Sequence, residues 1–590
     1  MRRIILLTTA LALVPLLNLE GQQTGTNLQR EVRLFNPYKP KLSEAEKKNY
    51  MPDMKDTTEL RPVFSYAVSP SAFVPVYTIS SIKPATIAPD PLSKLYKSYI
   101  TLGVGNYLSP LAEVSVTSER SKTAMLALSA KHFSSNGKLK LDNEQDVFAG
   151  YMDNELALYG KKFLNSSLIT GSVDFAQMTR YAYGYDTMFF DFEAQKEDIR
   201  LRYMDVGANM AVSSLRSDSG SLIYDGRFGY NYFRQSPDLG QQDVNVSFEA
   251  GKRIKALKSL GIGRGAKSSD FYAKVRAEYR LALLNKAIED KARHIITISP
   301  SLGKKSNEWS FNLGLHAVTE SRTFAGTGEY DTKFHLYPDI NLEIAIVPSF
   351  LNFNIEFDGN LVDNSAPNAV HINPFLITDG SLFTLPFTNN QIIAKAGLSG
   401  SVIPSTTYRV GASFTAFKDM VFYSNYVSVG LTFPEGYGNY FIPVVSDGSI
   451  TSVFGELNTR ISGKITSSVQ GNYYKYTLES IDFPFNKPSW DATIWLKYNL
   501  RDKIIAGAGL YAIGKRDAYV TNINTAGPPI PPDIFALPAN LSLNLSAEYR
   551  YTKVLSFWLK LNNISTGRYY EWAYYPSQRF MAMIGLSYSL

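Results

Sequence analysis

The side chains best suited to proton transfer or metal binding in this chain are its five histidines, His132, His294, His316, His335 and His371. No two of them stand two, three or four positions apart, so no local pair could bind a metal ion from one strand or one helical turn. Cysteine is absent, which excludes disulfides, thiolate metal sites and cysteine nucleophiles. We therefore expect neither a metal site nor a cofactor.

Two acidic regions offer further chemistry. His316 beside Glu343 or Glu356 could form a protease-like pair, as in small barrel enzymes, but those barrels are about half the length of this chain. Asp358-Gly359-Asn360 and the acids within 331–339 carry oxygen ligands suited to calcium, but solvated loop acids are the simpler interpretation. The sequence thus favours a protein that is not an enzyme.

Nucleotide and nucleic-acid binding are disfavoured. Gly261, Gly263 and Gly265 form a GxGxG pattern, but it follows no strand–helix unit, so a flexible basic link is the better interpretation. The 60 basic and 53 acidic residues leave a formal charge of only +7, and no basic cluster alternates with aromatics on one element, which argues against a nucleic-acid partner.

The N-terminus has the pattern of a secretory signal peptide. Arg2 and Arg3 precede an apolar stretch over 4–17, which is too short to cross a bilayer as a helix. We expect cleavage near Gly21, so that 1–21 is the signal peptide. No later stretch reaches 18 apolar residues, which argues against a helical membrane span.

From about residue 97 onward, apolar and polar residues alternate repeatedly, as in strands with one face against an apolar medium and one against water. The strands run about 10 to 14 residues, the length that a tilted membrane strand needs, whereas soluble sandwiches average five or six. The 38 Tyr and 34 Phe suit such strands and the aromatic girdles of a membrane barrel. The alternation is clearest in 309–316, 351–358, 490–499 and 541–550.

The connections indicate a topology. Short links occur at 164–165, 348–349, 404–405, 462–464, 499–502 and 551–553, and they alternate with long ones at 134–149, 178–197, 320–333, 363–390, 418–448, 480–488, 514–538 and 567–577. A basic link at 254–269 breaks the rule. Counting with this parity predicts an all-β fold, a transmembrane antiparallel β-barrel of about 22 strands over 97–590. The short turns and the C-terminus should be periplasmic, in the outer membrane of a Gram-negative bacterium.

The last 30 residues carry a resemblance to a known family. The Asn-rich strand 559–564, the aromatic loop with Tyr569, Tyr570, Trp572, Tyr574 and Tyr575, and the closing strand 579–590 resemble the C-terminal end of TonB-dependent receptors. The segments 94–96 and 102–107 look like the barrel start in Bacteroidota relatives of that family. The resemblance covers the barrel and implies a receptor or transporter for a substrate that the sequence does not identify. We expect the loop aromatics to anchor at the membrane interface.

One departure from the family concerns the N-terminal segment. Its plug domain is not recognisable, because only 22–96 precede the barrel, and this Pro-rich segment is expected to be short, extended and periplasmic or lumenal. Within it, Glu31, Val32, Arg33, Leu34 and Phe35 loosely resemble a TonB box, which would bind TonB by adding a strand. So wide a barrel needs a blockage, from this segment, the loops or a partner.

The predicted lumen-lining charges are Glu343, Glu356, Asp358, Asp491, Lys497, Glu548, Arg550 and Lys560. They could shape selectivity, or pair across strands as mixed charges do in any wet barrel. Besides an outer-membrane transporter or receptor, the alternative function is a non-transporting barrel, a scaffold or accessory subunit of an outer-membrane complex. The expected partners are outer-membrane lipid, TonB, and other outer-membrane or surface lipoprotein subunits.

Overall fold

A computed structural model describes residues 96–590, apart from 119–120, 186, 188–194, 216–220, 237–238, 255–270, 286–289, 307, 325–329, 377–384, 430–438, 525–531 and 566. Leu95–Leu590 form one compact unit. The predicted signal peptide, the Pro-rich segment with Glu31–Phe35, and the GxGxG link lie outside the described residues. Among the described residues, no helix is long and apolar enough to cross a membrane.

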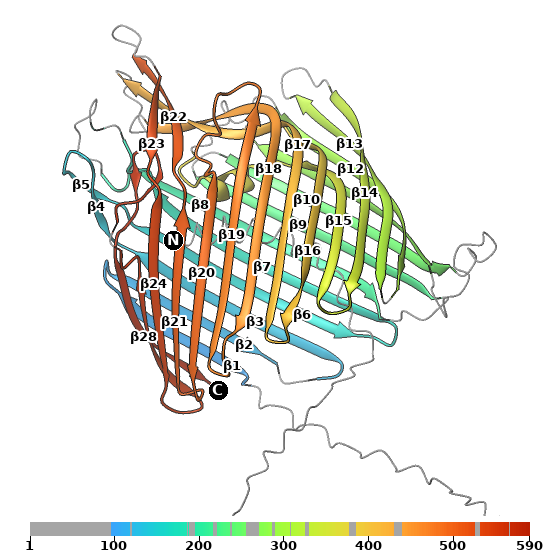
Figure 1. Cartoon of the computed structure of the whole chain (residues 1–590). Helices are drawn as coiled ribbons and strands as arrows, with labels where there is room; N and C mark the ends of the chain where they lie inside the picture. Colours follow the sequence, from blue (N-terminus) through green and yellow to red (C-terminus); the bar gives the residue numbers. More distant parts are fainter. Residues whose placement is uncertain are drawn as a thin grey trace, which may run out of the picture. The chain divides into compact units, whose positions relative to one another are not determined.

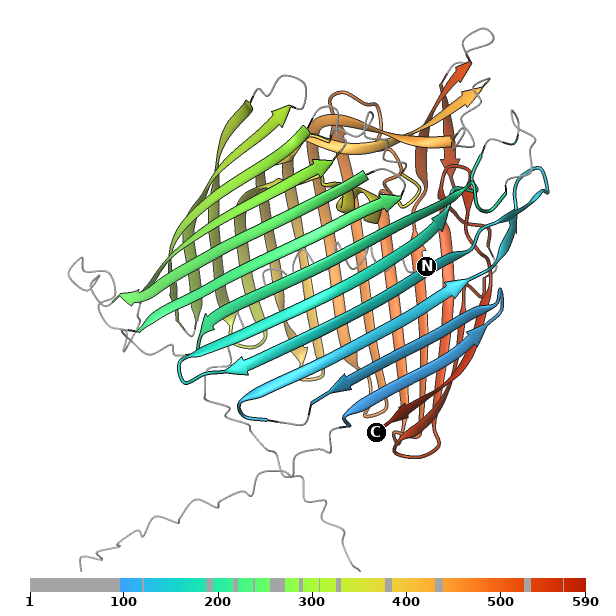
Figure 2. The same ribbon diagram turned by 180° about the vertical axis from the view of Figure 1, so that it is seen from behind.

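The described part of the chain is a closed antiparallel barrel of 22 strands, as predicted (Figures 1 and 2). Each strand pairs with its predecessor in the wall, and β28 pairs with β1 to close the sheet. The wall strands are β1 (Ser98–Gly105), β2 (Ser109–Thr117), β3 (Ala124–Ser135), β6 (Tyr151–Phe163), β7 (Ser167–Tyr181), β8 (Arg200–Ser214), β9 (Leu222–Ser236), β10 (Leu239–Ile254), β11 (Phe271–Asn285), β12 (Asp290–Lys305), β13 (Trp309–Phe324), β14 (Tyr330–Val347), β15 (Leu351–Val362), β16 (Thr388–Ile403), β17 (Thr406–Val429), β18 (Asn439–Arg460), β19 (Ile465–Leu478), β20 (Trp490–Leu500), β21 (Ile504–Ile513), β24 (Asn540–Arg550), β25 (Leu555–Asn562) and β28 (Met581–Ser589).

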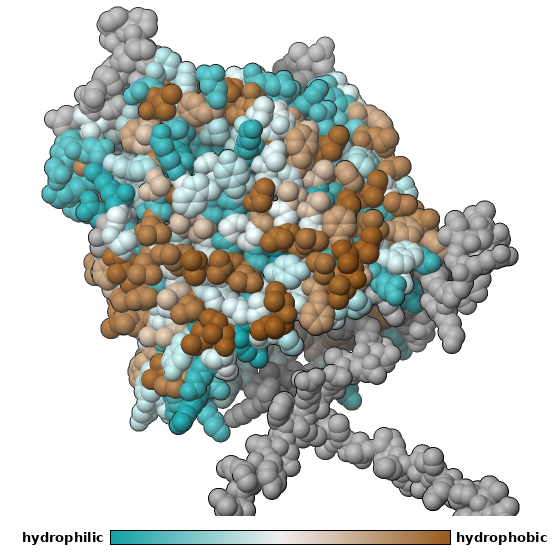
Figure 3. Space-filling model, in the orientation of Figure 1, coloured by the Kyte–Doolittle hydropathy of each residue, from teal (hydrophilic) through white to brown (hydrophobic). Residues whose placement is uncertain are grey.

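The alternation in the sequence corresponds to two faces of the wall. On β18, Val453 and Leu457 are exposed on the outer face, while Ser452 and Glu456 lie on the other face and contact β17. Side chains one residue apart in a strand point to opposite faces, so the period of two creates an apolar outer surface. Figure 3 shows hydrophobic side chains gathered in a band across the strands, with hydrophilic ones mostly toward the loop end.

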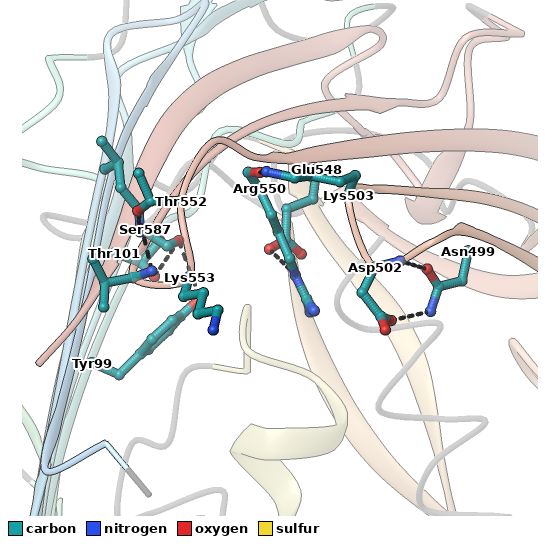
Figure 4. Close-up of polar contacts among 12 residues, drawn as sticks. Tyr99, Thr101, Asn499, Asp502, Lys503, Glu548, Arg550, Thr552, Lys553 and Ser587 are labelled. Atoms are coloured by element: carbon teal, nitrogen blue, oxygen red, sulfur yellow. Dashed lines mark hydrogen bonds and ion pairs between the residues drawn. The ribbon is translucent and has the colours of Figure 1, made fainter. Parts of the chain in front are cut away.

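The seam between β1 and β28 joins the two ends of the barrel domain. The Thr101 and Ser587 hydroxyls lie 2.9 Å apart, and the Tyr99 hydroxyl donates to Ser587 Oγ at 3.1 Å (Figure 4). Seven residue pairs are in register from Tyr99↔Ser589 to Gly105↔Met583. The closing strand therefore leaves no unpaired edge strand among the described strands of the wall.

The connections largely follow the prediction. All six short links are tight turns between wall strands; in one of them Asn499 Nδ2 donates to Asp502 Oδ1, 2.6 Å away (Figure 4). The eight predicted long links all lie at the opposite, loop end, but the one predicted at 320–333 is only five residues long, 325–329, because β13 and β14 extend into it. Three other connections at this end, 106–108, 237–238 and 286–289, are also short. Connections at the loop end are therefore mostly longer than the turns at the other end, but not all of them are.

The expectation of strands of 10 to 14 residues was too narrow. The wall strands run from 8 residues in β1 to 24 in β17. β17 and β18 pair over their whole length, with a bulge between Phe417 and Met420. Asp419 has φ 55°, and a Cβ on Gly448 (φ 155°) would lie 2.2 Å from the carbonyl oxygen of Thr477. A bulge bends a strand. Beyond this bulge β17 and β18 remain paired as far as Val427 and Asn439, and this bent end of the hairpin extends past the wall.

Further short elements lie in the loop-end connections. β4 (Lys138–Lys140) pairs with β5 (Asp146–Phe148), β22 (Arg516–Asn524) with β23 (Asp533–Leu537), and β26 (Tyr570–Trp572) with β27 (Tyr575–Pro576). The helix α2 (Ala366–Ile372) belongs to the β15–β16 connection.

Candidate functional site: the covered mouth and polar wall of the barrel

The eight predicted lumen charges lie on the strand face opposite the exposed apolar residues, distributed around the wall rather than in one site. On β14 and β15, Ser310 donates to Glu343 at 3.5 Å and Lys395 pairs with Glu356 at 2.8 Å. Asp358 lies 3.5 Å from His316. These carboxylates already have partners, as mixed charges in a polar wall are expected to have.

The remaining five lie between β20 and β25. Asn472 donates to Asp491 at 2.8 Å, and Arg550 pairs with Glu548 at 3.2 Å (Figure 4). Lys560 lies over the Trp558 ring at 4.9 Å, and Lys497 is exposed on the same face of β20 as Asp491. Single-sequence reasoning missed other wall pairs, Lys274 and Arg276 with Glu249 and Arg409 with Glu456, because only the strand register brings them together.

The geometry gives His316 partners other than the predicted Glu343 and Glu356, and it gives the candidate calcium ligand Asp331 two basic partners. The Nδ1 of His316 lies 2.7 Å from Ser299 Oγ, and its Nε2 faces Asp358 rather than Glu343 or Glu356. Asp331 pairs with Arg322 and Lys333. Among the described residues, no group of three or more histidines, aspartates or glutamates could hold a metal ion.

At the loop end, connections fold together into one apolar core over the mouth of the barrel. The β15–β16 connection enters it with α2, whose Ala366, Ala369 and Val370 are almost completely buried. Gln241 Oε1 accepts from the Ala366 N–H at 3.0 Å, and the Tyr203 hydroxyl donates to the Pro374 carbonyl at 2.9 Å. The wall of β8 and β10 thereby fixes α2 to the inner face near the loop end.

The aromatic β25–β28 connection belongs to the same core. Tyr575 is fully buried and stacks on Phe375, with ring centroids 3.9 Å apart. Trp572 packs edge-on against Phe441 at 5.2 Å, and the Tyr183 hydroxyl donates to the Pro576 carbonyl at 2.7 Å. The expectation that these aromatics anchor at the interface was wrong for Tyr569, Trp572 and Tyr575, which are buried because they fill the space between loops.

Polar contacts fix the rim of this core. Tyr570 donates to Asp142 in the β4–β5 hairpin at 2.7 Å, and Arg568 pairs with the same carboxylate at 2.8 Å. Burial and the Asp142 contact raise the pKa of Tyr570 to about 12, so its hydroxyl remains a donor at neutral pH. Arg516 donates to the carbonyls of Tyr570 and Glu571, which links a third connection to the rim.

A strand pairing crosses the mouth. Five residues of β17, Asn425–Val429, pair in parallel with Val520–Asn524 of β22. Because β18, β19 and β20 separate β17 from β21 in the wall, the pairing requires the bent β17–β18 hairpin to reach over the opening (Figure 1). Asn486, from the β19–β20 connection, donates to the Tyr423 carbonyl at 2.9 Å. Seven connections thus contribute to one cover: β3–β6, β7–β8, β15–β16, β17–β18, β19–β20, β21–β24 and β25–β28.

This fold is a large closed antiparallel β-barrel with its loops packed over one mouth. No protein-family model matches the sequence, and neither does any curated protein sequence. Solved structures do match. Similar ones are the ferric-catecholate import receptor Fiu from E. coli K12 (TM-score 0.58, 10% identity, 84% of this chain and 82% of that chain) and the FrpB iron transporter from Neisseria meningitidis (0.60, 11%, 85% and 82%).

A third is the pyoverdine outer-membrane receptor FpvA from Pseudomonas aeruginosa PAO1 bound to pyoverdine, with a TM-score of 0.61, 10% identity, and coverage of 84% of this chain and 79% of that chain. At 10–11% identity the likeness establishes the fold. Of these three neighbours, Fiu is an import receptor, FrpB an iron transporter and FpvA an outer-membrane receptor.

Proposed function

We propose that the chain is an outer-membrane receptor and transporter of the TonB-dependent kind. The observation that carries the proposal is the packed cover of loops over the mouth of a barrel with a polar inner wall. A 22-stranded wall encloses a space too wide for its own side chains to fill, and a permanently open pore would not need such a cover. A gated path for one substrate would need it.

The proposed path begins at the cover and continues along the polar wall. Glu343, Glu356, Asp358, Asp491, Lys497, Glu548, Arg550 and Lys560 are proposed to line it. The loop end faces outward and the short turns with the C-terminus face the periplasm in this proposal, since long outward loops and short periplasmic turns are the rule for such barrels.

The orientation can be tested with introduced cysteines, because the chain has none of its own. A membrane-impermeant maleimide should label Tyr330→Cys, at the loop end, on intact cells. Lys553→Cys, in a turn, should react only after the outer membrane is permeabilised. The reverse pattern would refute the orientation.

Energised transport can be tested through Glu31–Phe35. In a strain lacking the gene, under a nutrient limitation that reveals its growth defect, the full-length chain should restore growth. The variant lacking 31–35 should not, although it is folded and surface-labelled to the same extent. Deletion of 43–47 is the control of equal length. A silent 31–35 deletion, together with stable co-purification of other subunits in mild detergent, would instead support the scaffold alternative.

A further inference from the structure

Three arginines on the outer surface of β8 and β9 lie near the loop end. The inward face of these strands is fixed by Tyr203 and Phe233, each 2% exposed and part of the loop core. Neighbouring residues in a strand point to opposite faces. Arg202 and Arg234 therefore point outward, as does Arg200, and all three are exposed.

The residues below them define their level. On the outer face, exposed Met210 faces exposed Phe228 across the strands, and Val206 faces Tyr232 nearer the loop end. The next pair along is Met204 with Arg234, followed by Arg202 with Ser236. Toward the loop end, the outward side chains therefore change from apolar to aromatic to basic. This is the order expected where a barrel surface passes from the hydrocarbon core to the head-group region of a membrane.

These arginines differ from those on the inner face. Arg180 pairs with Asp153 at 2.8 Å and Arg276 with Glu249 at 3.1 Å. Within the described part of the chain, Arg200, Arg202 and Arg234 form no ion pair and no hydrogen bond. Three neighbouring guanidinium groups that form no ion pair with a described carboxylate repel one another, and an anion between them removes that repulsion.

A row of polar side chains continues the same level toward the seam. His132 Nδ1 lies 2.6 Å from Asn154 Oδ1, and Asn154 Nδ2 donates to Gln177 Oε1 at 3.2 Å. Gln177 is the register partner of Met204, beside Arg234. Asn154 is two positions from exposed Leu156 on β6, and Gln177 is four positions from exposed Val173 on β7. Residues an even number of positions apart share a face, so the row belongs to the outer face.

We propose that Arg200, Arg202 and Arg234 bind the phosphate-bearing head group of a membrane lipid in the leaflet at the loop end. Guanidinium groups match phosphate oxygens in forked pairs, and the acyl chains would lie along Met210, Phe228 and Val246, which are all exposed. The site rests on the proposed membrane location, but it is separate from the transport path, on the opposite face of the wall.

The test measures lipid binding to the purified full-length protein in detergent by native mass spectrometry, with diphosphorylated lipid A as the probe. The triple variant Arg200→Gln/Arg202→Gln/Arg234→Gln should bind about a hundredfold more weakly, since each basic residue near a membrane surface contributes about fivefold. The matched control is Arg460→Gln, an exposed arginine at the turn end, which should leave binding unchanged. Equal binding by the triple variant would overturn the proposal.

Two further experiments test whether the bound anion is a lipid head group or free phosphate, and whether forked guanidinium–phosphate pairing is required. Inorganic phosphate should not displace the lipid; displacement by phosphate alone would show a free-anion site and overturn the lipid assignment. An Arg→Lys triple variant should recover only part of the affinity, because lysine lacks the fork, and recovery in full would refute forked recognition. Lipid binding is measured on the purified protein and does not depend on transport. A negative uptake assay would therefore contradict the proposed function without affecting the lipid-binding result.

Discussion

The ring of Tyr575 stacks on that of Phe375, with centroids 3.9 Å apart and planes inclined by 21°. The two residues come from different connections, β25–β28 and β15–β16, and neither belongs to the barrel wall. Their contact lies within the core that also holds Tyr183, Tyr203 and Trp572. The stability of the cover is therefore expected to depend on packing between loops more than on the wall itself.

Replacement of Tyr575 by alanine should loosen the cover and leave the barrel folded. Removing a buried aromatic ring reduces stability by about 3–5 kcal/mol. Because Tyr575 packs against other loops, this loss should reduce the stability of loop docking. Limited proteolysis should cut the loop-end connections of the Tyr575→Ala variant faster, while its strand content is unchanged. Tyr549→Ala, on the exposed outer face, is the control; equal proteolysis of both variants would contradict the role of Tyr575.

A disulfide between β17 and β22 should lock the cover. Asn425 and Val520 are register partners and almost completely buried, and neighbouring paired strands lie about 5 Å apart, within the range that a disulfide spans. In planar bilayers with mild urea, the oxidised Asn425→Cys/Val520→Cys protein should show no channel openings, and reduction should restore them.

The control for this lock is a pair within the wall, Ser413→Cys/Ser452→Cys, at residues whose hydroxyls lie 2.7 Å apart on β17 and β18. Its oxidation should leave the openings unchanged. If the β17–β22 lock also had no effect, the crossing strands would not be the part that moves.

Docking of α2 should weaken as the pH falls. The His371 side chain is exposed, but the surrounding protein partly desolvates its ring and so lowers its pKa. The negative charge of Asp205 opposes this shift, and the positive charge of Arg180 adds to it. A histidine with a lowered pKa when docked stabilises docking above its free pKa, near 6.5, and this contribution is lost as the pH falls below that value. Protection of the 366–376 amides from hydrogen exchange, after correction for the intrinsic pH dependence of amide exchange, should therefore decrease between neutral and mildly acidic pH.

The matched variant is His371→Gln, which keeps a polar side chain of similar reach but does not titrate. Its exchange over 366–376 should depend on pH only through the intrinsic chemistry of the amides. A persistent difference between pH values beyond that correction would assign the effect to another group.

The wall could be predicted from the sequence because its signal is local. Val453 and Leu457 alternate with polar neighbours, and a period of two specifies which residues share a face. The strand count of 22 and the tight turns at 404–405 and 551–553 followed from the same pattern. The N-terminal segment and its TonB-box-like residues remain predictions.

The cover could not be predicted in the same way. Tyr575 and Phe375 have no shared period, and their contact exists only because two loops fold toward the same axis. The parallel pairing of β17 with β22 likewise requires a bend at Asp419 and Gly448 that no hydropathy pattern records. The aromatic β25–β28 loop was recognised as unusual, but its rings could equally have faced a membrane interface.

The two faces of the wall should respond differently to the same charge. Val453 is 53% exposed on the outer face of β18, and Ser452 beside it faces inward. Arginine on the lipid face near the middle of the bilayer costs about 2–4 kcal/mol, whereas an inward arginine stays in contact with water. In urea unfolding from lipid vesicles, Val453→Arg should therefore lower the free energy of unfolding by about that amount, while Ser452→Arg should lose only about 1 kcal/mol from its hydrogen bond to Ser413. Equal losses would mean that the two faces meet the same medium, and the transmembrane barrel would then be excluded.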